Sequence, residues 1–159
     1  MRGTKILEIK KRIVKVLRNK LEENLAIAGR QFERTRQDVI EAPGRMQSRY
    51  DSSKQESGYL ADSWQNRIRQ LKLAIITLKE LKINDAPQEE ITIGALVETE
   101  KDLYFVLPVG GGEKIKDGQL NKEVIIVTPT SPIGKSLLNK TAGDCILLGP
   151  KKLTIISVF

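Results

Sequence analysis

Histidine is absent from the 159-residue chain, and cysteine occurs once, at Cys145. Without histidine the chain lacks the usual general base and the commonest metal ligand, so Ser-His and Cys-His catalysis and histidine-based zinc sites are excluded. A lone cysteine cannot form an internal disulfide, which fits a reducing compartment and predicts a cytoplasmic protein. The apolar stretch around Cys145 is typical of a strand, and we expect Cys145 to be inert and buried in the core.

Aromatic residues are also scarce, at 4% of the chain, whereas 40% is hydrophobic and 30% charged. Few aromatic side chains leave little material for a large compact core, but they suit a coiled coil, whose seam is made of Leu and Ile. No apolar run approaches the roughly 18 residues that a membrane span requires. The N-terminal segment is interrupted by Lys and Arg every few positions, so we expect neither a signal peptide nor a membrane partner.

The positive charge lies entirely in the first half of the chain. Residues 1–85 hold 19 Lys and Arg against 11 Asp and Glu, whereas residues 86–159 hold 8 against 9. A basic half favours an acidic partner, either nucleic acid or an acidic protein channel, although a long helix with a well-solvated Lys/Arg surface gives the same balance.

The first half has helical periodicity. Apolar residues recur at helical spacing from Ile6 to Val39, and residues 5–41 contain no proline and a single glycine, Gly29, which predicts one unusually long helix. Pro43 and Gly44 end it. A second periodic run, close to a heptad seam, predicts a helix over about 51–82. Two such helices joined by a short connection fold back on each other. Whether this hairpin projects alone or dimerises into four helices stays open.

The second half has the character of a small β-rich domain. Apolar runs predict strands over 91–97, 103–109, 123–128, 144–148 and 152–159, of which 123–128 and 152–159 are rich in β-branched residues, with a short helix over 134–139. The sequence therefore predicts an α+β protein with a helical hairpin over 1–84, a linker over 84–88 and a β-rich domain over 85–159.

Two glycine-containing segments lack the spacing of a phosphate-binding loop. Gly110, Gly111 and Gly112 are followed by Glu113 rather than by a Lys and a hydroxyl residue, and the Gly-Lys-Ser at 134–136 lacks the glycine that must precede it. Both are predicted to be turns. We expect no small-molecule substrate and no cofactor of the protein's own.

A more specific pattern occupies residues 131–144. Its members, in order, are Ser131, Pro132, Leu137, Leu138, Lys140, Gly143 and Asp144. This order and spacing resemble the signature of the C-terminal domain of the Gre transcription elongation factors (GreA and GreB), and the sequence of hairpin, linker and small domain is similar over nearly the whole chain. The resemblance implies an FKBP-like fold for the C-terminal domain and a coiled-coil hairpin before it.

The resemblance also implies a partner and a mode of action. Gre factors dock their C-terminal domain at the rim of the RNA polymerase secondary channel and insert the hairpin into the channel. Two acidic residues at the hairpin tip then help to hold a second Mg²⁺ for cleavage of backtracked RNA, with the polymerase supplying most ligands. The family's docking loop corresponds here to Thr130, Ser131, Pro132, Ile133 and Gly134.

The tip departs from the family. When the chain is aligned with the family's tip on Tyr50, the tip here comprises Pro43, Gly44, Arg45, Met46, Gln47, Ser48, Arg49 and Tyr50. Pro43 and Met46 stand where cleavage-active members have acidic residues, and neither offers the oxygen that Mg²⁺ prefers. Arg45 and Arg49 oppose a cation and suit contacts with phosphate, including that of the nascent RNA. We therefore predict no catalytic residue and no metal site, and no metal other than the polymerase's own Mg²⁺.

The favoured prediction is a polymerase-binding factor, not itself an enzyme, that modulates elongation or pausing without stimulating transcript cleavage. Two alternatives stay open. In the first, a shifted register brings Glu41 and Asp51 to the tip and supports cleavage. In the second, a free-standing nucleic-acid-binding protein uses a basic face, although the chain lacks the aromatic platforms of single-strand binders. That face comprises Lys10, Lys11, Arg12, Lys15, Arg18 and Lys20.

Overall fold

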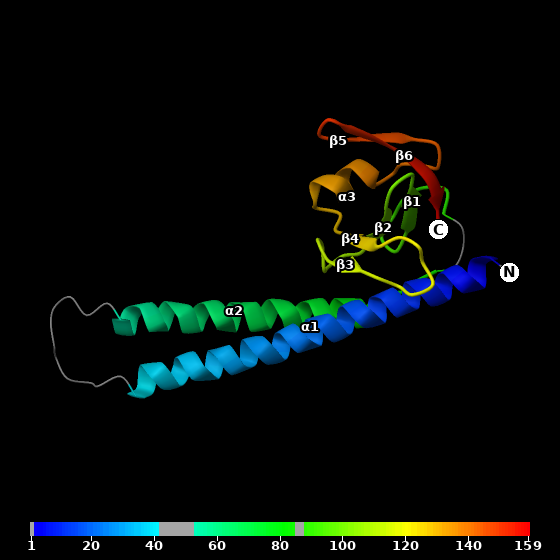
Figure 1. Cartoon of the computed structure of the whole chain (residues 1–159). Coiled ribbons are helices and arrows are strands. Elements are labelled where there is room, and N and C mark those ends of the chain that lie inside the picture. Colours follow the sequence, from blue (N-terminus) through cyan, green and yellow to red (C-terminus); the bar gives the residue numbers. More distant parts are fainter. Residues whose placement is uncertain (1, 42–52, 85–87) are drawn as a thin grey trace. The chain divides into compact units, whose positions relative to one another are not determined.

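A computed structural model describes residues 2–41, 53–84 and 88–159 of the chain (Figure 1). The chain divides into two compact units, one comprising Asn19–Ile76 and the other Met1–Arg18 with Thr77–Phe159. The elements, in order, are α1 (Arg2–Glu41), α2 (Ser53–Glu80), β1 (Leu96–Thr99), β2 (Leu103–Val106), β3 (Lys114–Ile115), β4 (Val124–Val127), α3 (Pro132–Leu137), β5 (Cys145–Leu148) and β6 (Lys151–Val158). None of the described helices is long and apolar enough to cross a membrane.

The two long helices form as the periodicity predicts. α1 extends over 40 residues without an internal proline and α2 over 28, so their ends lie within a few residues of the predicted ones. Within the unit Asn19–Ile76, the buried positions recur along one stripe of each helix. They are Leu21, Ala28 and Thr35 on α1 and Leu71 and Ile75 on α2. The Thr35 hydroxyl donates to the Gln31 carbonyl at 2.8 Å, which satisfies the one polar group in the stripe.

The other unit is built on a six-stranded mixed sheet in the order β3-β4-β2-β1-β6-β5. β2 and β4 are parallel, and the remaining neighbours are antiparallel. Long helices followed by this sheet make the chain an α+β protein, as predicted. Two details differ from the prediction. β1 begins only at Leu96, and the two-residue strand β3 was not anticipated.

The late start of β1 has a physical cause. Ile91 exchanges main-chain hydrogen bonds with the end of the α3 segment, since its N–H donates to the Lys140 carbonyl and its carbonyl accepts from the Asn139 N–H. The Ala95 N–H donates to the Thr92 carbonyl in a turn. These residues therefore anchor a loop rather than extend a strand.

The core of the sheet unit is apolar and rich in β-branched residues. Its buried members are Ile91, Ala95, Val97, Tyr104, Val106, Val127, Leu137, Ile146, Leu153, Ile155 and Val158. Fully burying one such aliphatic side chain contributes about 1.5–3 kcal/mol relative to leaving it exposed. Leu137 is the member supplied by α3, so the core fixes the short helix and the loop that leads into it.

The first turns of α1 belong to the sheet unit. Ile13 and Leu17 are fully buried, and Leu17 packs on the glycine turn, where a Cβ added to Gly110 would lie 2.8 Å from Leu17 Cδ2. Gly110 has a φ of +81°, a conformation that glycine adopts without strain. The glycine run is thus a turn, as predicted, and Leu17 of α1 packs against it.

The expectation for Cys145 is half right. Cys145 begins strand β5, but its side chain is exposed, because alternate residues of a strand point to opposite faces and Ile146 takes the inward position. The prediction that Cys145 lies in the core is therefore wrong. The Cys145 sulfur lies 3.8 Å from the Thr154 hydroxyl on the neighbouring strand.

Candidate functional site

The predicted docking loop leads from β4 into α3, and its geometry is set by Ser131. The Ser131 hydroxyl donates to the Thr128 carbonyl at 2.7 Å and accepts from the Gly134 N–H at 3.0 Å. Ser131 is the N-cap of α3 and Pro132 follows in the first turn, where its missing N–H costs nothing. The loop is therefore a corner held by the hydrogen bonds of Ser131.

Gly134 completes this corner by allowing a close approach. A Cβ on Gly134 would collide with the main-chain oxygen of Thr128 and would lie 3.0 Å from the Ser131 hydroxyl. Gly134 is buried, and residues 134–136 lie within helix α3, so the prediction of a turn there is wrong. Gly134 does not adopt a left-handed conformation, so the requirement for glycine is one of space. Ser131 and Gly134 thus have structural roles, whatever else the loop does.

The remaining loop residues differ in exposure. Thr130 and Pro132 are exposed, whereas Ile133 is half-buried and packs against the core of the sheet unit. Lys135, on the next turn of α3, is exposed as well. The loop therefore presents Thr130 and Pro132 on a fixed support, with a positive charge nearby. A docking role for the five residues 130–134 stays a prediction.

The second part of the motif is also structural. Leu137 is fully buried, and Leu138 packs against the same core. Gly143 has a φ of +93° and donates its N–H to the Ile155 carbonyl, which joins the turn to β6. Asp144 accepts from the Thr141 N–H at 2.8 Å and from the Thr141 hydroxyl at 3.2 Å. The motif thus describes how the corner and the following turn are built.

An ion pair joins the first turns of α1 to the segment after β3. Arg12 makes a bidentate contact with Asp117, with Nε 2.9 Å from Oδ2 and Nη2 3.2 Å from Oδ1, and Nη2 also donates to Gln119 at 3.1 Å. The hydrogen bond from Arg12, with further help from the Gln119 N–H, lowers the pKa of the Asp117 carboxyl. Hydrogen bonds from the Thr141 N–H and hydroxyl likewise lower the pKa of Asp144.

These two carboxyls give the stability a predicted pH dependence. Because a lowered pKa means that the folded state favours the ionised form, each group stabilises the fold above the ordinary carboxyl pKa, and this stabilisation is lost as the pH falls below about 4. We expect the thermal midpoint to fall over this range and to fall less steeply in Asp117→Asn and Asp144→Asn. The check is a series of melts followed by circular dichroism. If the thermal midpoint of both variants fell with pH as steeply as that of the parent protein, Asp117 and Asp144 would not be the source of the pH dependence.

The basic face expected on α1 is smaller than the sequence suggested. Lys10 is fully buried, and its Nζ donates to the Asn84 carbonyl at 3.2 Å, while Arg12 is bound to Asp117. Arg18 is half-buried. The exposed members are Lys11, Lys15 and Lys20. Sequence periodicity could not find the long-range partners of Lys10 and Arg12, because those partners lie in other elements.

The hairpin tip predicted at Pro43–Tyr50 lies outside the described residues, as does Asp51. Glu41, the other acid of the cleavage alternative, is exposed at the end of α1. Among the described residues, no group of three or more Cys, Asp or Glu side chains is placed to hold a metal ion. The roles of the tip and of Glu41 and Asp51 stay predictions.

The comparisons with known proteins give a set of solved structures. One, of the transcription factor Gfh1, is 18% identical, covers 89% of this chain and 92% of its own, and has a TM-score of 0.36. GreA factor homolog 1 (Gfh1) of Thermus thermophilus is 19% identical, covers 94% of each chain and has a TM-score of 0.35. Thermus aquaticus Gfh1 is 18% identical over 88% of this chain and 92% of its own, with a TM-score of 0.33. No family model and no curated protein matches the chain. At this identity and TM-score the structures do not place the chain in a family.

Proposed function

We propose that the protein is an RNA polymerase accessory factor that acts through the secondary channel and modulates elongation or pausing without stimulating transcript cleavage. The observation that carries the proposal is the corner at 130–134. Ser131 and Gly134 hold it rigidly, and Thr130 and Pro132 stand exposed on it. A rigid support with exposed anchors is what a docking contact needs, because little conformational entropy is lost on binding.

The two parts of the chain support complementary roles in this proposal. The sheet unit supplies the docking corner, and a long hairpin with a basic sequence at its tip supplies the inserted arm. The tip positions that are acidic in cleavage-active Gre factors are here Pro43 and Met46, and Arg45 and Arg49 lie beside them. Positive side chains at this place favour contact with phosphate rather than recruitment of a divalent cation.

The proposal predicts that the exposed half of the corner binds the polymerase. Thr130→Asp combined with Pro132→Ala is expected to weaken binding of the purified protein to RNA polymerase by about 2 kcal/mol, or about thirtyfold. Neither substitution removes a core contact, so the thermal midpoint is expected to stay within a few degrees of the parent protein. The measurement is a binding isotherm with labelled protein.

The matched control for this experiment is Lys101→Ala, an exposed position of the same unit between β1 and β2, which is expected to leave binding unchanged. Ile133→Asp is not a clean test, because the half-buried Ile133 packs on the core and the substitution lowers stability as well. Unchanged binding by the double variant would refute a docking role for the corner. Strong binding of free RNA that falls steeply with salt would favour the nucleic-acid-binding alternative.

A further inference from the structure

The sheet ends on one side in a strand whose outer edge is open. β5 is the last strand in the order β3-β4-β2-β1-β6-β5, and no strand of the described ranges pairs with its outer edge (Figure 1). None of its four residues, Cys145 to Leu148, carries a charge. An unpaired row of main-chain N–H and C=O groups is a template for another strand, and natural sheets usually protect it.

The opposite edge of the sheet is protected in the usual way. β3 is only two residues long, its Lys114 is exposed, and the next residue, Lys116, forms an ion pair with Glu123 at 3.2 Å. Short edge strands and lysine side chains both discourage strand addition. β5 instead carries Leu147, which is 71% exposed, more than any other large apolar side chain described in the sheet unit. The edge at β5 therefore suits an apolar strand.

The main chain of β5 points alternately toward β6 and toward the open edge. The Asp144 carbonyl accepts from the Ile155 N–H, so the polar groups of Asp144 face β6. In an antiparallel pair this alternates along the strand. The polar groups of Ile146 therefore also face β6, whereas those of Cys145 and Leu147 face the open edge.

A second copy of β5 fits this edge in an antiparallel register. A two-fold axis through Ile146 places Cys145 of each copy opposite Leu147 of the other. Each of these residues then donates its outward N–H to, and accepts at its outward carbonyl from, the residue opposite. The exposed Leu147 side chain packs beside Cys145 of the other copy, and the two sheets become continuous.

The charges near the edge do not oppose this pairing. Asp144 of one copy lies opposite the apolar Leu148 of the other, and its carboxylate accepts from Thr141 within its own copy. Lys151 and Lys152 are on β6, so three inter-strand steps, about 14 Å, separate them from their counterparts, which exceeds the Debye length of about 10 Å at 0.1 M salt. Four residues a side are far fewer than the roughly 20–30 of a stable interface, so the pair is weak and reversible.

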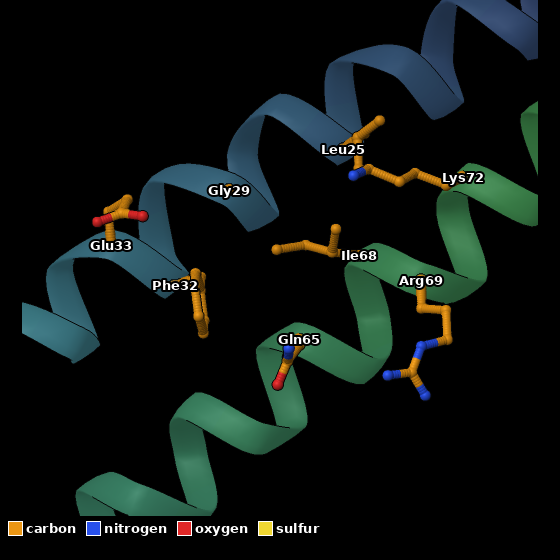
Figure 2. Close-up of a pocket in the computed structure, with 8 residues that line it drawn as sticks. All are labelled: Leu25, Gly29, Phe32, Glu33, Gln65, Ile68, Arg69 and Lys72. Carbon is orange, nitrogen blue, oxygen red and sulfur yellow. The ribbon is translucent and has the colours of Figure 1, made fainter.

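The groove between α1 and α2, in the other unit, does not offer a comparable surface. It has a volume of about 670 Å³, and its Phe32 and Ile68 lie half-buried between the two helices (Figure 2). Charged side chains of both signs lie in or beside it on each helix, Arg30, Glu33 and Arg36 on α1 and Asp62, Arg69 and Lys72 on α2. The groove therefore does not favour the pairing of two hairpins, and an unpaired hairpin is what entry into the channel requires.

We propose that two copies of the chain pair reversibly through the open edge of β5, with Cys145 of each copy opposite Leu147 of the other. The pairing uses no residue of the unit Asn19–Ile76 and none of the corner at 130–134. β4, which leads into the corner, is separated from β5 by β2, β1 and β6. The inference does not depend on polymerase binding, and its tests contain no polymerase, so either can fail while the other stands.

The first test is the concentration dependence of mass in sedimentation equilibrium, using the full chain up to about 1 mM. The parent protein is expected to pass from monomer to dimer. Leu147→Lys places a charge on the edge and is expected to weaken the dimer about tenfold. Ile156→Lys is the matched control, because Ile156 is 49% exposed but lies on β6, away from the edge, and it is expected to leave the dimer unchanged.

Two results of this test would overturn the proposal. One is a monomer at every concentration, which would leave the edge to a strand of another protein. The other is an equal effect of Leu147→Lys and Ile156→Lys on the dimer. Circular dichroism of each variant checks that the fold is retained, and the cross-linking experiment below tests the pairing without a charged substitution.

Cross-linking tests the register and uses the native Cys145. The parent chain is mixed with a chain carrying Cys145→Ser and Leu147→Cys under mild oxidation. Residues that exchange hydrogen bonds across an antiparallel pair have Cα atoms about 5.5 Å apart, which suits a disulfide, whereas like positions are diagonal to each other. Mixed disulfide dimers are expected in several-fold excess over those of either chain alone. Cross-linking of like chains in equal or greater yield, or none at all, would overturn the proposal.

Discussion

Gly134→Ala is expected to lower the free energy of unfolding of the sheet-containing unit by about 3 kcal/mol. The added Cβ collides with the main-chain oxygen of Thr128, which is a backbone atom and not the mobile end of a side chain. The corner must therefore open, and the hydrogen bonds of Ser131 to Thr128 and Gly134 are strained or lost with it. A single methyl group thus disturbs the loop and the N-terminus of α3 together.

The measurement is equilibrium denaturation followed by two signals. Far-ultraviolet circular dichroism reports the whole chain, and Trp64, the only tryptophan, reports the helical unit. Gly118→Ala is the matched control, because a Cβ there meets nothing within 4 Å and the residue is not left-handed. The control is expected to change stability by less than about 0.5 kcal/mol. Equal effects of the two substitutions would show that the close approach at Gly134 is unimportant.

Leu17→Ala is expected to destabilise the same unit by about 3 kcal/mol, within the range found for large-to-small core substitutions. Leu17 is on a helix that the sequence assigns to the hairpin, yet its side chain is fully buried and packs on Gly110 of the sheet unit. The substitution therefore removes apolar contacts from the sheet unit and leaves a cavity at the glycine turn.

The neighbouring residue gives the control for this prediction. Val16 is 47% exposed, so Val16→Ala is expected to cost well under 1 kcal/mol. Both variants are compared by chemical denaturation at one pH. If Leu17→Ala were as mild as Val16→Ala, the first turns of α1 would not be part of the sheet unit. A fragment that begins at residue 85 would then be expected to fold as stably as the sheet unit of the full chain.

Most of the helices and strands could be predicted from local sequence patterns. The long helices follow from an apolar repeat without internal proline, and strands β2, β4 and β6 follow from runs of aromatic and β-branched residues. What failed needed information from distant residues. Ile91 reads as part of a strand, but its main chain bonds to Lys140 and Asn139 instead. Cys145 has apolar neighbours, and only the pairing of β5 with β6 determines which face it takes.

The candidate site was predictable only in outline. The motif located the corner at 130–134, but the sequence did not show which of its residues are exposed. In the structure, Ser131 and Gly134 build the corner, while Thr130 and Pro132 are exposed on it. The contacts of Lys10 with Asn84 and of Arg12 with Asp117 connect residues far apart in the chain, so a count of basic residues overestimates the free positive face.

RNA length in stalled elongation complexes, with Mg²⁺ and with or without the purified protein, is the most direct test of the proposed function. Complexes are immobilised so that bound protein and RNA length are read from the same sample. We predict that the protein is retained on the complexes and that the RNA is not shortened faster than in its absence. Rapid shortening by the unaltered chain, abolished by Glu41→Ala or Asp51→Ala, would contradict the account by assigning a metal role to the shifted acids. Failure of the protein to bind the complexes at all would contradict it equally.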